Sequence, residues 1–581
     1  MSERIVVDPV TRIEGHLRIE AQTNEKGEIT AAYSSGTSVR GLETILKGRD
    51  PRDSWVYAQR ICGVCTLVHG IASVRAVEDA LDYKVPKNAE IIRNLMIASQ
   101  YIHDHVMHFY HLHSLDWVDV VSALDADPKA TSVLQQKTST HAKSSPGYFA
   151  KVKEKLKGLV DSGQLGIFGQ GFWGHPEYKL PPEANLMVLA HYLEALEWQR
   201  NVVQLQAIFG GKNPHPNLIV GGAPSPISID PNGMGGSEAT AVNLAGLEEV
   251  RKVIKRMYQF VNEVYLQDTV LIGSYYKDWF ARGEGVGNFM CYGNFPLDDI
   301  NDPSSWMIPS GVILNRDLST IHPVDLSDPE QIQEFVAHSW YKYSKGKDAG
   351  LHPYEGETEL DYDGPKPPYE HLDVDKSYSW IKTPRWRGKP MEVGPLARIL
   401  MLHANNHEPT KRLTAAALNQ LGLPFEAMYS TMGRTLARSL ESVVINEAME
   451  GWLDTLLDNI KAGDLQVHNT SKWDPSTWPS EAKGVGFMEA GRGALAHYMV
   501  IKDGQIENYQ AVVPSTWNAG PRDHNGVPSP YEAALEDGHT LYDPKQPLEI
   551  QRTIHSFDPC IACAIHVNDP DGEELISMRI V

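Results

Sequence analysis

The chain carries RICGVC at residues 60–65 and DPCIACAIH at residues 558–566, near its opposite ends. Each stretch contains a C-x-x-C pair, whose two sulfurs can bind one metal ion, and we expect Gly63 to relax the backbone between Cys62 and Cys65. Four thiolates form a soft ligand set, suited to zinc, iron–sulfur clusters or other thiophilic metals rather than to calcium or magnesium. Because the pairs lie so far apart, a site that they share has to be assembled by the whole fold.

Spacing alone leaves four interpretations of the two pairs open. They are a structural four-cysteine zinc site, an iron–sulfur cluster, two unrelated redox or inert motifs, and a catalytic metal centre. A structural zinc site usually stabilises a small module without a core, whereas this chain has 581 residues and 42% hydrophobic content. Ionisable residues also flank the cysteines, namely Arg60, Asp558 and His566. Both observations favour a functional centre.

Charge and hydropathy exclude several other classes. The formal net charge is −21, and an acidic surface repels phosphate, so nucleic-acid binding and binding to anionic membranes are disfavoured. We find no apolar run of about 18 residues, the length needed to span a bilayer. The start of the chain lacks a signal-peptide pattern, so we expect synthesis in the cytoplasm and export, if any, with another protein. The remaining cysteine, Cys291, lies outside every motif and is assigned no role.

Hydrophobic periodicity predicts a mainly helical chain with small β elements at both ends, an α+β class. Apolar residues at helical spacing begin after Asn88, and a second run starts at Pro182 and stops at Gly210-Gly211. Further long helices are predicted at Glu238–Tyr276 and Lys411–Lys461, and irregular structure at residues 285–390. Strands are predicted at Arg4–Val7, His16–Ala21 and Ile29–Ser34, and a hairpin at Tyr498–Lys502 and Tyr509–Val513. We expect one large domain with a central helical bundle.

The motifs R-x-C-G-x-C and D-P-C-x-x-C-x-x-H resemble the paired signatures of nickel–iron hydrogenase large subunits. The resemblance covers essentially the whole chain, and its group is the membrane-associated uptake type. Further stretches match in the order of the family: Arg12–His16, Arg40–Glu43, His103–His105, Arg492–Leu495 and Val513–Asn518. The resemblance implies a catalytic subunit for the reversible heterolytic cleavage of H2 into protons and electrons.

The resemblance also implies a role for each cysteine of the two motifs. Cys62 and Cys560 would be terminal ligands of nickel, and Cys65 and Cys563 would bridge nickel to an iron that carries CO and two cyanide ligands. Thiolates donate electron density, and strong-field ligands keep the iron low-spin, so that H2 can bind and be polarised. The proton needs a nearby base.

Three bases are open by this resemblance: Cys560 with Glu14 as its relay, Arg492, and a water. We favour Cys560 with Glu14, because a carboxylate relays protons readily, whereas free guanidinium has a pKa above about 12. Asp104 and Asp558 resemble the carboxylates that flank Arg492 and offset its charge.

Two further groups of residues resemble parts of the family's site. Ser515 and the backbone near Pro514 resemble the hydrogen-bond donors to a cyanide nitrogen, and Gly491 stands where relatives often have proline. Glu43 and His566, with a backbone carbonyl near Ala511, resemble the ligands of a hard cation such as magnesium.

The family's biosynthesis implies further features. Members are made as precursors that an endopeptidase cuts after the histidine of the second motif once nickel is inserted. We therefore expect a mature chain of residues 1–566 and a removable extension, Val567–Val581.

The family also implies partners. With no cysteines left for an electron relay, we expect an iron–sulfur small subunit, facing the region of Pro214-His215-Pro216, in a heterodimer or a dimer of heterodimers. Nickel-insertion proteins and a membrane cytochrome or quinone-linked acceptor are the other expected partners. A twin-arginine signal on the small subunit would carry both subunits to the periplasmic side of the membrane.

Two alternative functions remain from the sequence: a four-cysteine zinc scaffold, and an H2 sensor of the same superfamily, against which the extension argues. His105, His108 and His111 have helical spacing, but such histidines are more often core or proton-path residues than metal ligands. Val64 and Leu112 match positions that narrow the family's gas path and are otherwise ordinary core residues.

Overall fold

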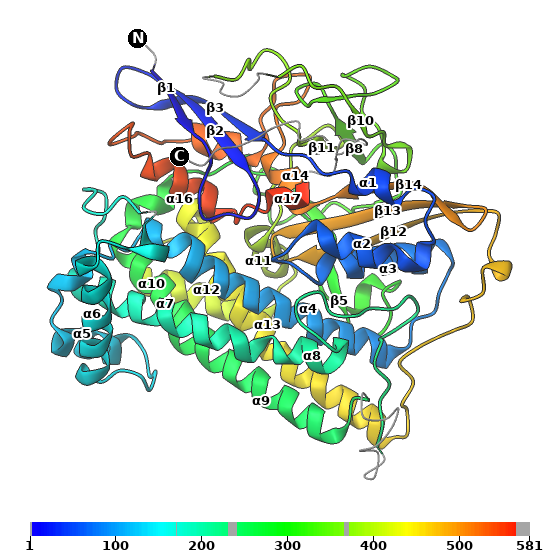
Figure 1. Ribbon diagram of the computed structural model, residues 1–581, viewed down its shortest axis with the longest axis horizontal. Helices are drawn as coiled ribbons and strands as arrows, with labels where there is room; N and C mark the ends of the chain where they lie inside the picture. The colour runs from blue at the N-terminus through cyan, green and yellow to red at the C-terminus, as the bar shows by residue number, and fades with distance from the viewer. Residues whose placement is uncertain (1–2, 170, 230–240, 365–370, 565–581) are drawn as a thin grey trace.

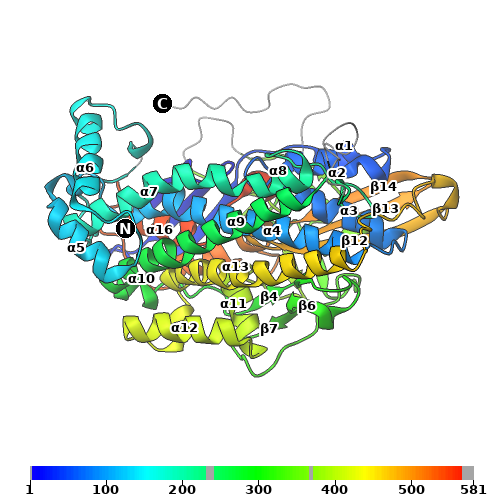
Figure 2. The ribbon, with the colours of Figure 1, turned by 90° about the horizontal axis from the view of Figure 1, so that it is seen from below.

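The computed structural model describes residues 3–169, 171–229, 241–364 and 371–564 (Figure 1). In this part of the chain, long helices lie side by side along the lower half of Figure 1, and the sheets lie above them. Seen from below, the same helices form a broad layer across the molecule (Figure 2). The architecture combines helices with antiparallel sheets, as an α+β chain requires.

The N-terminal residues form an antiparallel sheet of β1 (Glu3–Val7), β2 (Leu17–Thr23) and β3 (Ile29–Gly36), in that order. The three strands predicted there are confirmed, with β2 and β3 extended by two residues at their ends. Alternate residues of β2, Leu17, Ile19 and Ala21, are completely buried, because successive side chains of a strand point to opposite faces. The turn between β2 and β3 contains Gly27, which has a φ of 76°.

The layer of long helices contains α4 (Lys87–Met107), α7 (Pro182–Val202), α9 (Leu244–Phe260) and α13 (Thr431–Lys461). The predicted apolar face of α4 is confirmed, since Ile91, Leu95, Ile102 and Val106 are all buried. Helix α13 packs against α4, α9, α10 (Leu266–Tyr275) and α11 (Pro395–Ala404). Contact with so many neighbours explains why α13 is buried over most of its length.

Two predicted long helices are interrupted. The prediction of one helix over Lys411–Lys461 is wrong, because α12 (Glu408–Leu421) ends at Gly422 with a left-handed φ of 67° and Pro424 follows before α13 begins. The helix predicted at Glu238–Tyr276 consists of α9, a π-helical turn at Val261–Tyr265 and α10. Its predicted first residues, 238–240, lie outside the described residues. The helix predicted from Pro182 is α7 followed by α8 (Gln204–Gly210), which ends at Gly211 as predicted.

The C-terminal sheet orders β12 (Glu481–Ala490), β13 (Gly493–Lys502) and β14 (Gln505–Val512). The predicted hairpin is confirmed between β13 and β14, while β12 was not predicted. Helix α3 (Val68–Ala80) packs directly on β12 and β13. A Cβ on Gly486 would lie 1.8 Å from the carbonyl oxygen of Ala72, so glycine is required for this close packing. The packing fixes α3, which begins three residues after Cys65, against the sheet.

Between residues 285 and 390, the described residues (285–364 and 371–390) are mostly loops with short paired strands, as predicted. The strands are β4 (Phe289–Cys291), β5 (Asn294–Pro296), β6 (Trp306–Ile308), β7 (Gly311–Ile313), β8 (Ile332–Phe335), β9 (Tyr341–Lys342), β10 (Glu359–Leu360) and β11 (Thr383–Trp386). The remaining α-helices are α1 (Leu42–Leu46), α2 (Ser54–Ala58), α5 (Pro128–Thr138), α6 (Pro146–Asp161), α14 (Pro514–Ala519), α15 (Pro530–Glu536), α16 (Leu548–Ser556) and α17 (Ile561–Ala564).

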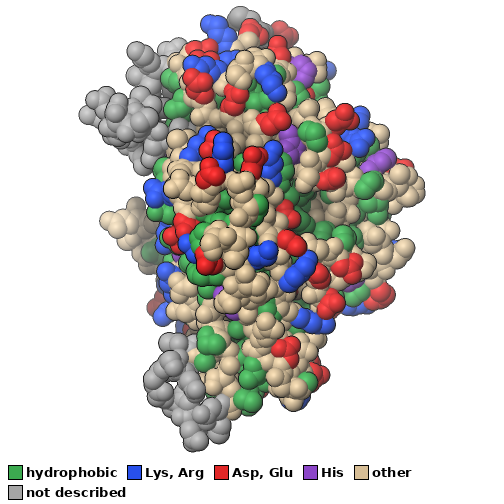
Figure 3. All heavy atoms as spheres, turned by 90° about the vertical axis from the view of Figure 1, so that its right-hand side faces the viewer, with side chains coloured by type: hydrophobic (Ala, Val, Ile, Leu, Met, Phe, Trp, Pro, Cys, Tyr) green, Lys and Arg blue, Asp and Glu red, His purple; other side chains and the backbone are tan. Residues whose placement is uncertain are grey.

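Two further features of the structure concern membrane crossing and surface charge. Among the described helices, none combines the length and the apolar content that crossing a membrane requires. On the face that forms the right-hand side of Figure 1, acidic and basic side chains are interspersed (Figure 3). The negative net charge is therefore not gathered into one field on this face.

Candidate metal centre

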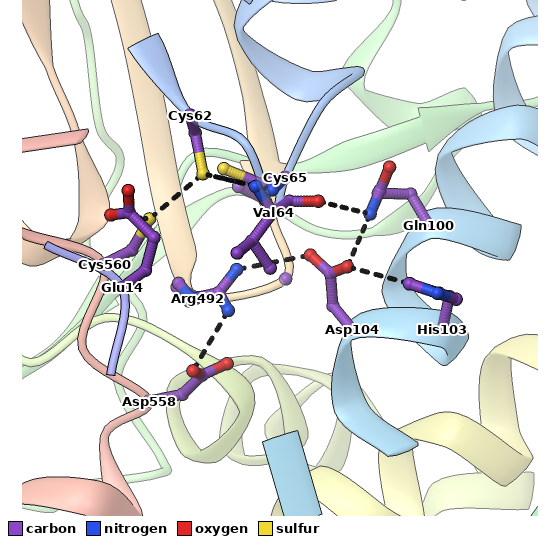
Figure 4. A network of polar contacts seen from close by, with 12 residues as sticks. Glu14, Cys62, Val64, Cys65, Gln100, His103, Asp104, Arg492, Asp558 and Cys560 are labelled. Atoms are coloured by element: carbon purple, nitrogen blue, oxygen red, sulfur yellow. Dashed lines mark hydrogen bonds and ion pairs between the residues drawn. The ribbon is translucent and has the colours of Figure 1, made fainter. Parts of the chain in front are cut away.

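The four motif cysteines meet in the interior of the protein. The Sγ atoms of Cys62 and Cys560 are 3.4 Å apart, those of Cys65 and Cys563 3.5 Å, and those of Cys560 and Cys563 2.7 Å. All four ligand atoms lie within 4.8 Å of one another, and no disulfide joins them. Each cysteine is almost completely buried. The two ends of the chain thus provide one four-sulfur site, and Figure 4 shows three of its cysteines, Cys62, Cys65 and Cys560.

The segment around Glu14 holds the C-terminal motif in place. The backbone N–H of Glu14 donates to the carbonyl of Pro559 at 3.3 Å, and the N–H of Ile561 donates to the carbonyl of Glu14 at 2.8 Å. The next residue, Gly15, has a φ of 85°, and a Cβ on it would lie 2.4 Å from the backbone nitrogen of Ala562. The close approach of the two segments therefore depends on glycine.

Backbone hydrogen bonds shape the N-terminal motif. The N–H groups of Val64 and Cys65 donate to the Sγ of Cys62 at 3.2 and 3.1 Å, which favours a thiolate there. The Arg40 guanidinium donates to the carbonyls of Ile61 and Ala562 and so connects the two motifs. The expectation for Gly63 is corrected: its φ is not left-handed and a Cβ would meet nothing within 4 Å. The bend between the cysteines does not require glycine.

Without bound cations the site cannot hold four thiolates. Burial raises the pKa of Cys62, but hydrogen bonds from the other three thiols outweigh burial and hold that pKa well below its usual value. Burial raises the pKa values of Cys560 and Cys563 well above theirs. One sulfur therefore ionises at the expense of the others. Metal ions are needed to hold all four as thiolates in this interior, and the soft donor set fits nickel and iron.

The carboxyl of Glu14 lies beside the sulfur of Cys560. The thiol of Cys560 donates to Oε2 of Glu14 at 3.2 Å, and the backbone N–H of Ala562 donates to the same oxygen at 3.0 Å. Burial, followed by the charge of Cys62, raises the pKa of Glu14 to about 7. A carboxyl with such a pKa, in contact with a ligand sulfur, is suited to accept and release a proton near neutral pH.

Arg492 lies over the sulfurs between two carboxylates (Figure 4). Its guanidinium donates to Oδ2 of Asp104 at 3.2 Å and to Oδ1 of Asp558 at 3.1 Å. Burial lowers the pKa of Arg492, but Asp558, Cys560 and Asp104 outweigh burial and hold it well above its ordinary value. The side chain therefore stays charged and is poorly suited to act as a base. Gly491 is fixed through its carbonyl, which accepts from Arg398 at 2.8 Å.

Ser515 and Pro514 border a small cavity beside three of the sulfurs, those of Cys65, Cys560 and Cys563. The backbone N–H of Cys560 donates to the Ser515 Oγ at 3.0 Å. This bond fixes Ser515 next to the C-terminal motif at the start of α14. The cavity lies on the side of the site away from Cys62, and Ser515 and Pro514 provide polar and apolar groups in its lining.

Comparison with known proteins decides the family. Residues 40–566 match the sequence profile of the family described as nickel-dependent hydrogenase, and residues 4–37 match a profile described as HoxL-like. The chain belongs to the nickel-dependent hydrogenase large subunits. This hydrogenase large subunit is 54% identical to the uptake hydrogenase large subunit of Rhizobium leguminosarum bv. viciae over 587 residues, covering 100% of this chain and 97% of that protein. It is 50% identical to the hydrogenase-1 large chain of Escherichia coli K12 over 586 residues, covering 99% and 97% of the two chains.

Solved structures show the same fold at lower identity. The Ni-Fe-Se hydrogenase from D. vulgaris Hildenborough in the reduced state matches with a TM-score of 0.75 and 33% identity, covering 97% of this chain and 100% of that one. The [NiFeSe]-hydrogenase of Dm. baculatum matches with a TM-score of 0.74 and 33% identity, covering the same shares. The hydrogenase large subunit is therefore the catalytic subunit for H2 cleavage, as the sequence predicted, with four cysteines placed to bind its metal centre.

Sequence reasoning missed His69 in this hydrogenase large subunit. His69 is the second residue of α3, four residues after Cys65, and its Nε2 is 3.3 Å from the Sγ of Cys563. Burial lowers the pKa of His69 to about 4, so the ring is neutral at ordinary pH. A histidine only four residues after a motif cysteine was the available signal.

The residues predicted to hold a hard cation are brought together in part. The N–H of Ala511 donates to Oε1 of Glu43 at 3.0 Å, and Thr358 donates its hydroxyl to Oε2. Within a strand, the N–H and C=O of one residue point to the same side, so the carbonyl of Ala511 faces Glu43 as well. The Nζ of Lys382 is 3.8 Å from Glu43. His566, the third predicted ligand, lies outside the described residues.

The histidines of α4 and the following turn have separate partners. His105 contacts Glu441 at 2.7 Å, His108 donates to the carbonyl of His555 at 2.7 Å, and His111 donates to that of Tyr192 at 3.2 Å. Their partners lie on different elements, in keeping with their interpretation as core residues. A second group also has its ligand atoms close together: His113, Asp116 and His555. Both histidines hydrogen-bond to the carboxylate of Asp116, which also forms an ion pair with Arg12.

The remaining predicted positions are placed as follows. Val64 is half-buried beside Cys65, and its carbonyl accepts from Gln100 at 3.3 Å. The carbonyl of Leu112 accepts from Arg12. Pro214 is exposed, and the carbonyl of Pro216 accepts from Gln59 at 2.7 Å. The loop predicted to face a partner therefore contacts the segment that leads into RICGVC.

Proposed function

We propose that Cys62 and Cys560 bind nickel as terminal ligands, and that Cys65 and Cys563 bridge nickel to an iron that carries CO and two cyanide ligands. The cavity beside the sulfurs supports this assignment. It borders Cys65 and Cys563 together with Ser515 and Pro514, and Cys62 is not part of its lining. Small iron ligands would find space on the bridging side, with Ser515 and the backbone after Pro514 available as donors to a cyanide nitrogen.

The bound centre would supply the electron-rich site at which H2 is polarised. Cys560 and Glu14 would take up the proton, because the Glu14 carboxyl is 3.2 Å from the Cys560 sulfur and burial raises its pKa to about 7. Arg492 would hold its positive charge over the reacting atoms, fixed by Asp104 and Asp558. The observation that carries the proposal is that four buried sulfurs meet at one place, with the Glu14 carboxyl on one side and the Arg492 guanidinium on the other.

Infrared spectroscopy and elemental analysis of the purified complex test the proposal. We expect stretching bands of metal-bound CO and cyanide and one nickel per large subunit, with iron in excess of nickel because the clusters of the small subunit also contain iron. Zinc in place of nickel, without these bands, would instead support the four-cysteine scaffold. The sensor alternative is less well supported, because the similar proteins at 54% and 50% identity are named an uptake hydrogenase large subunit and a hydrogenase-1 large chain.

A second, hard cation, most simply magnesium, would bind between Glu43, the carbonyl of Ala511 and His566. The side of β14 that carries Ala511 faces Glu43, and one carboxylate, one carbonyl and waters suit such an ion. Its role would be to fix the C-terminal motif beside the sheet. Magnesium analysis of the purified Glu43→Gln variant tests this, since loss of one equivalent is expected and an unchanged content would contradict it.

The electrons from H2 would leave through an iron–sulfur small subunit that contacts the region of Pro214-His215-Pro216. The designation of the similar proteins as large subunits supports this partner. Nickel-insertion proteins, a maturation endopeptidase and a membrane cytochrome or quinone-linked acceptor would complete the system, with export to the periplasmic side on the small subunit's signal. Deleting that signal should leave both subunits in the cytoplasm, and large subunit that still reached the periplasm would contradict co-export.

The same proposal includes the organisation of the chain. Residues 1–566 would form one mature domain around the central helices, because its site needs both ends of the chain. Val567–Val581 would be the extension removed on maturation. Limited proteolysis of the mature protein should yield no smaller stable fragment that retains nickel.

A further inference from the structure

A line of buried polar side chains leads from the Cys563 sulfur into the C-terminal sheet. His69 Nε2 is 3.3 Å from Cys563 Sγ, and His69 Nδ1 is 3.0 Å from His497 Nε2. His497 Nδ1 is in turn 2.5 Å from the hydroxyl of Tyr509. The three side chains come from α3, β13 and β14, whose packing is fixed by the close contact of the helix with the sheet. Each ring nitrogen of both histidines therefore has a partner along this line.

The line continues beyond Tyr509 to two serines. The Tyr509 hydroxyl interacts with the side chain of Ser73, and the Oγ atoms of Ser73 and Ser54 are 2.7 Å apart. The Ser54 hydroxyl has one proton, which it donates either to the carbonyl of Pro51, 2.7 Å away, or to Ser73. That carbonyl also accepts the backbone N–H of Ser54, so it stays satisfied when the hydroxyl donates to Ser73.

A metal-bound thiolate determines the direction of every hydrogen bond in this line. Such a sulfur only accepts, so His69 has to carry its proton on Nε2 and accept at Nδ1. The proton at that contact then comes from Nε2 of His497, whose Nδ1 accepts the hydroxyl proton of Tyr509. The Tyr509 oxygen is left to accept from Ser73, and Ser73 from Ser54. All five hydrogen bonds then point toward Cys563.

We propose that His497 and Tyr509 are positioning residues that orient His69 as a donor to the Cys563 sulfur and so tune the electron density that this sulfur gives to the metals. The Nε2–H of His69 becomes a stronger hydrogen-bond donor when Nδ1 of the same ring accepts a hydrogen bond, because aligned hydrogen bonds polarise one another. An N–H held on a thiolate withdraws charge from it. The line therefore lets residues on β13 and β14 act on the metal centre without touching it.

The first readout is the infrared bands of CO and cyanide in the purified, metal-containing complex. For this readout the inference rests on the proposed iron ligands. Weaker donation to Cys563 makes the metals richer in electrons and shifts the CO band to lower wavenumber. We expect this shift in His69→Leu, which removes the donor, a smaller one in His497→Phe and a still smaller one in Tyr509→Phe. Ser73→Ala should shift the band less than Tyr509→Phe, since it removes a donor one step further away.

Tyr498→Phe is the matched control. Tyr498 is next to His497 on β13 but points to the other face, and among the described residues its buried hydroxyl has no hydrogen-bond partner. Its spectrum should superimpose on that of the wild type. A Tyr509→Phe spectrum that also superimposes on the wild type, or a shift of equal size in Tyr498→Phe, would overturn the proposal.

Nickel electron paramagnetic resonance provides a second readout that does not depend on the iron ligands. In an odd-electron state the g-values report the thiolate donation to nickel, and the variants should follow the same order. If the infrared bands are missing from every sample, the proposed iron ligands are wrong. The resonance spectra of Tyr509→Phe and Tyr498→Phe then decide on the hydrogen-bonded line alone, and identical spectra would contradict it.

Discussion

The carboxyl of Glu14 lies 3.2 Å from the sulfur of Cys560, although 546 residues separate the two in the chain. The backbone around Glu14 also pairs with the C-terminal motif, so the carboxyl is fixed by main-chain hydrogen bonds on both sides. The proposed proton acceptor is therefore held by the same segment that supplies the proposed ligand Cys560.

Replacement of Glu14 by glutamine should remove this proton acceptor. The amide keeps the size of the side chain and can still accept from Ala562, so we expect nickel and iron contents to be unchanged. H2 oxidation should fall by about 10²–10⁴-fold, the usual contribution of a positioned acid or base. Turnover by the wild type, Glu14→Gln and Glu532→Gln, a buried carboxyl outside the centre, provides the comparison. Activity of Glu14→Gln equal to that of Glu532→Gln would contradict the role.

Replacement of Arg492 by lysine should keep the charge and lose the geometry. A lysine ammonium cannot extend two parallel arms to Asp104 and Asp558 as a guanidinium does. We expect H2 oxidation to fall by about 10²-fold with metals retained, since a fixed charge at a reacting centre contributes on that scale. Arg385→Lys, at a buried Arg–Asp pair with Asp523, measures the general cost of such a change. The role would be wrong if both variants lost activity equally.

Replacement of Gly15 by alanine should separate the N-terminal segment from the C-terminal motif. The new Cβ would lie 2.4 Å from the nitrogen of Ala562, and the φ of 85° disfavours any side chain. We expect a lower melting temperature and a reduced nickel content. Gly63→Ala is the matched control within the other motif, because its Cβ would meet nothing within 4 Å. Equal nickel contents in the two variants would contradict the importance of this contact.

Buried Glu532 predicts a pH-dependent loss of stability. Burial raises the pKa of Glu532 from 4.5 to about 7, so the folded state binds this proton more tightly than the unfolded state does. The contribution to stability is therefore full below the unfolded pKa and is lost as the pH rises through about 7. The melting temperature of the wild type should fall more between acidic and mildly alkaline pH than that of Glu532→Gln. An identical fall in both proteins would show that Glu532 titrates normally.

Maturation predicts the mass of the active chain. In nickel-containing, active enzyme the large subunit should end at His566, because removal of Val567–Val581 would let the second motif close on the metals. Chain produced in cells starved of nickel should still end at Val581. Intact-mass spectrometry of both preparations measures this. Fully active enzyme with the complete extension would contradict it.

Local patterns predicted much of the fold. The face of α4 and the strands of the N-terminal sheet could be read from periodicity, because the spacing of apolar residues reflects which side of an element is buried. The break between α12 and α13 was missed, since one glycine and one proline interrupted a run of otherwise helical residues. Strand β12 was missed because Gly484 and Gly486 weaken its pattern, and the helix packed on them explains their presence.

The sequence by itself determined that the centre is a soft thiolate site, because two C-x-x-C pairs supply four sulfurs and residue type fixes the class of metal that such donors suit. The order of the motifs along the chain then indicated the family, and with it nickel and iron. Only the tertiary structure decided that His69 contacts Cys563, that His497 and Tyr509 continue the line behind it, and that Arg40 joins the two motifs. Those contacts join segments separated by many residues, and their geometry follows from how α3, the C-terminal sheet and the N-terminal segment pack, which no local pattern contains.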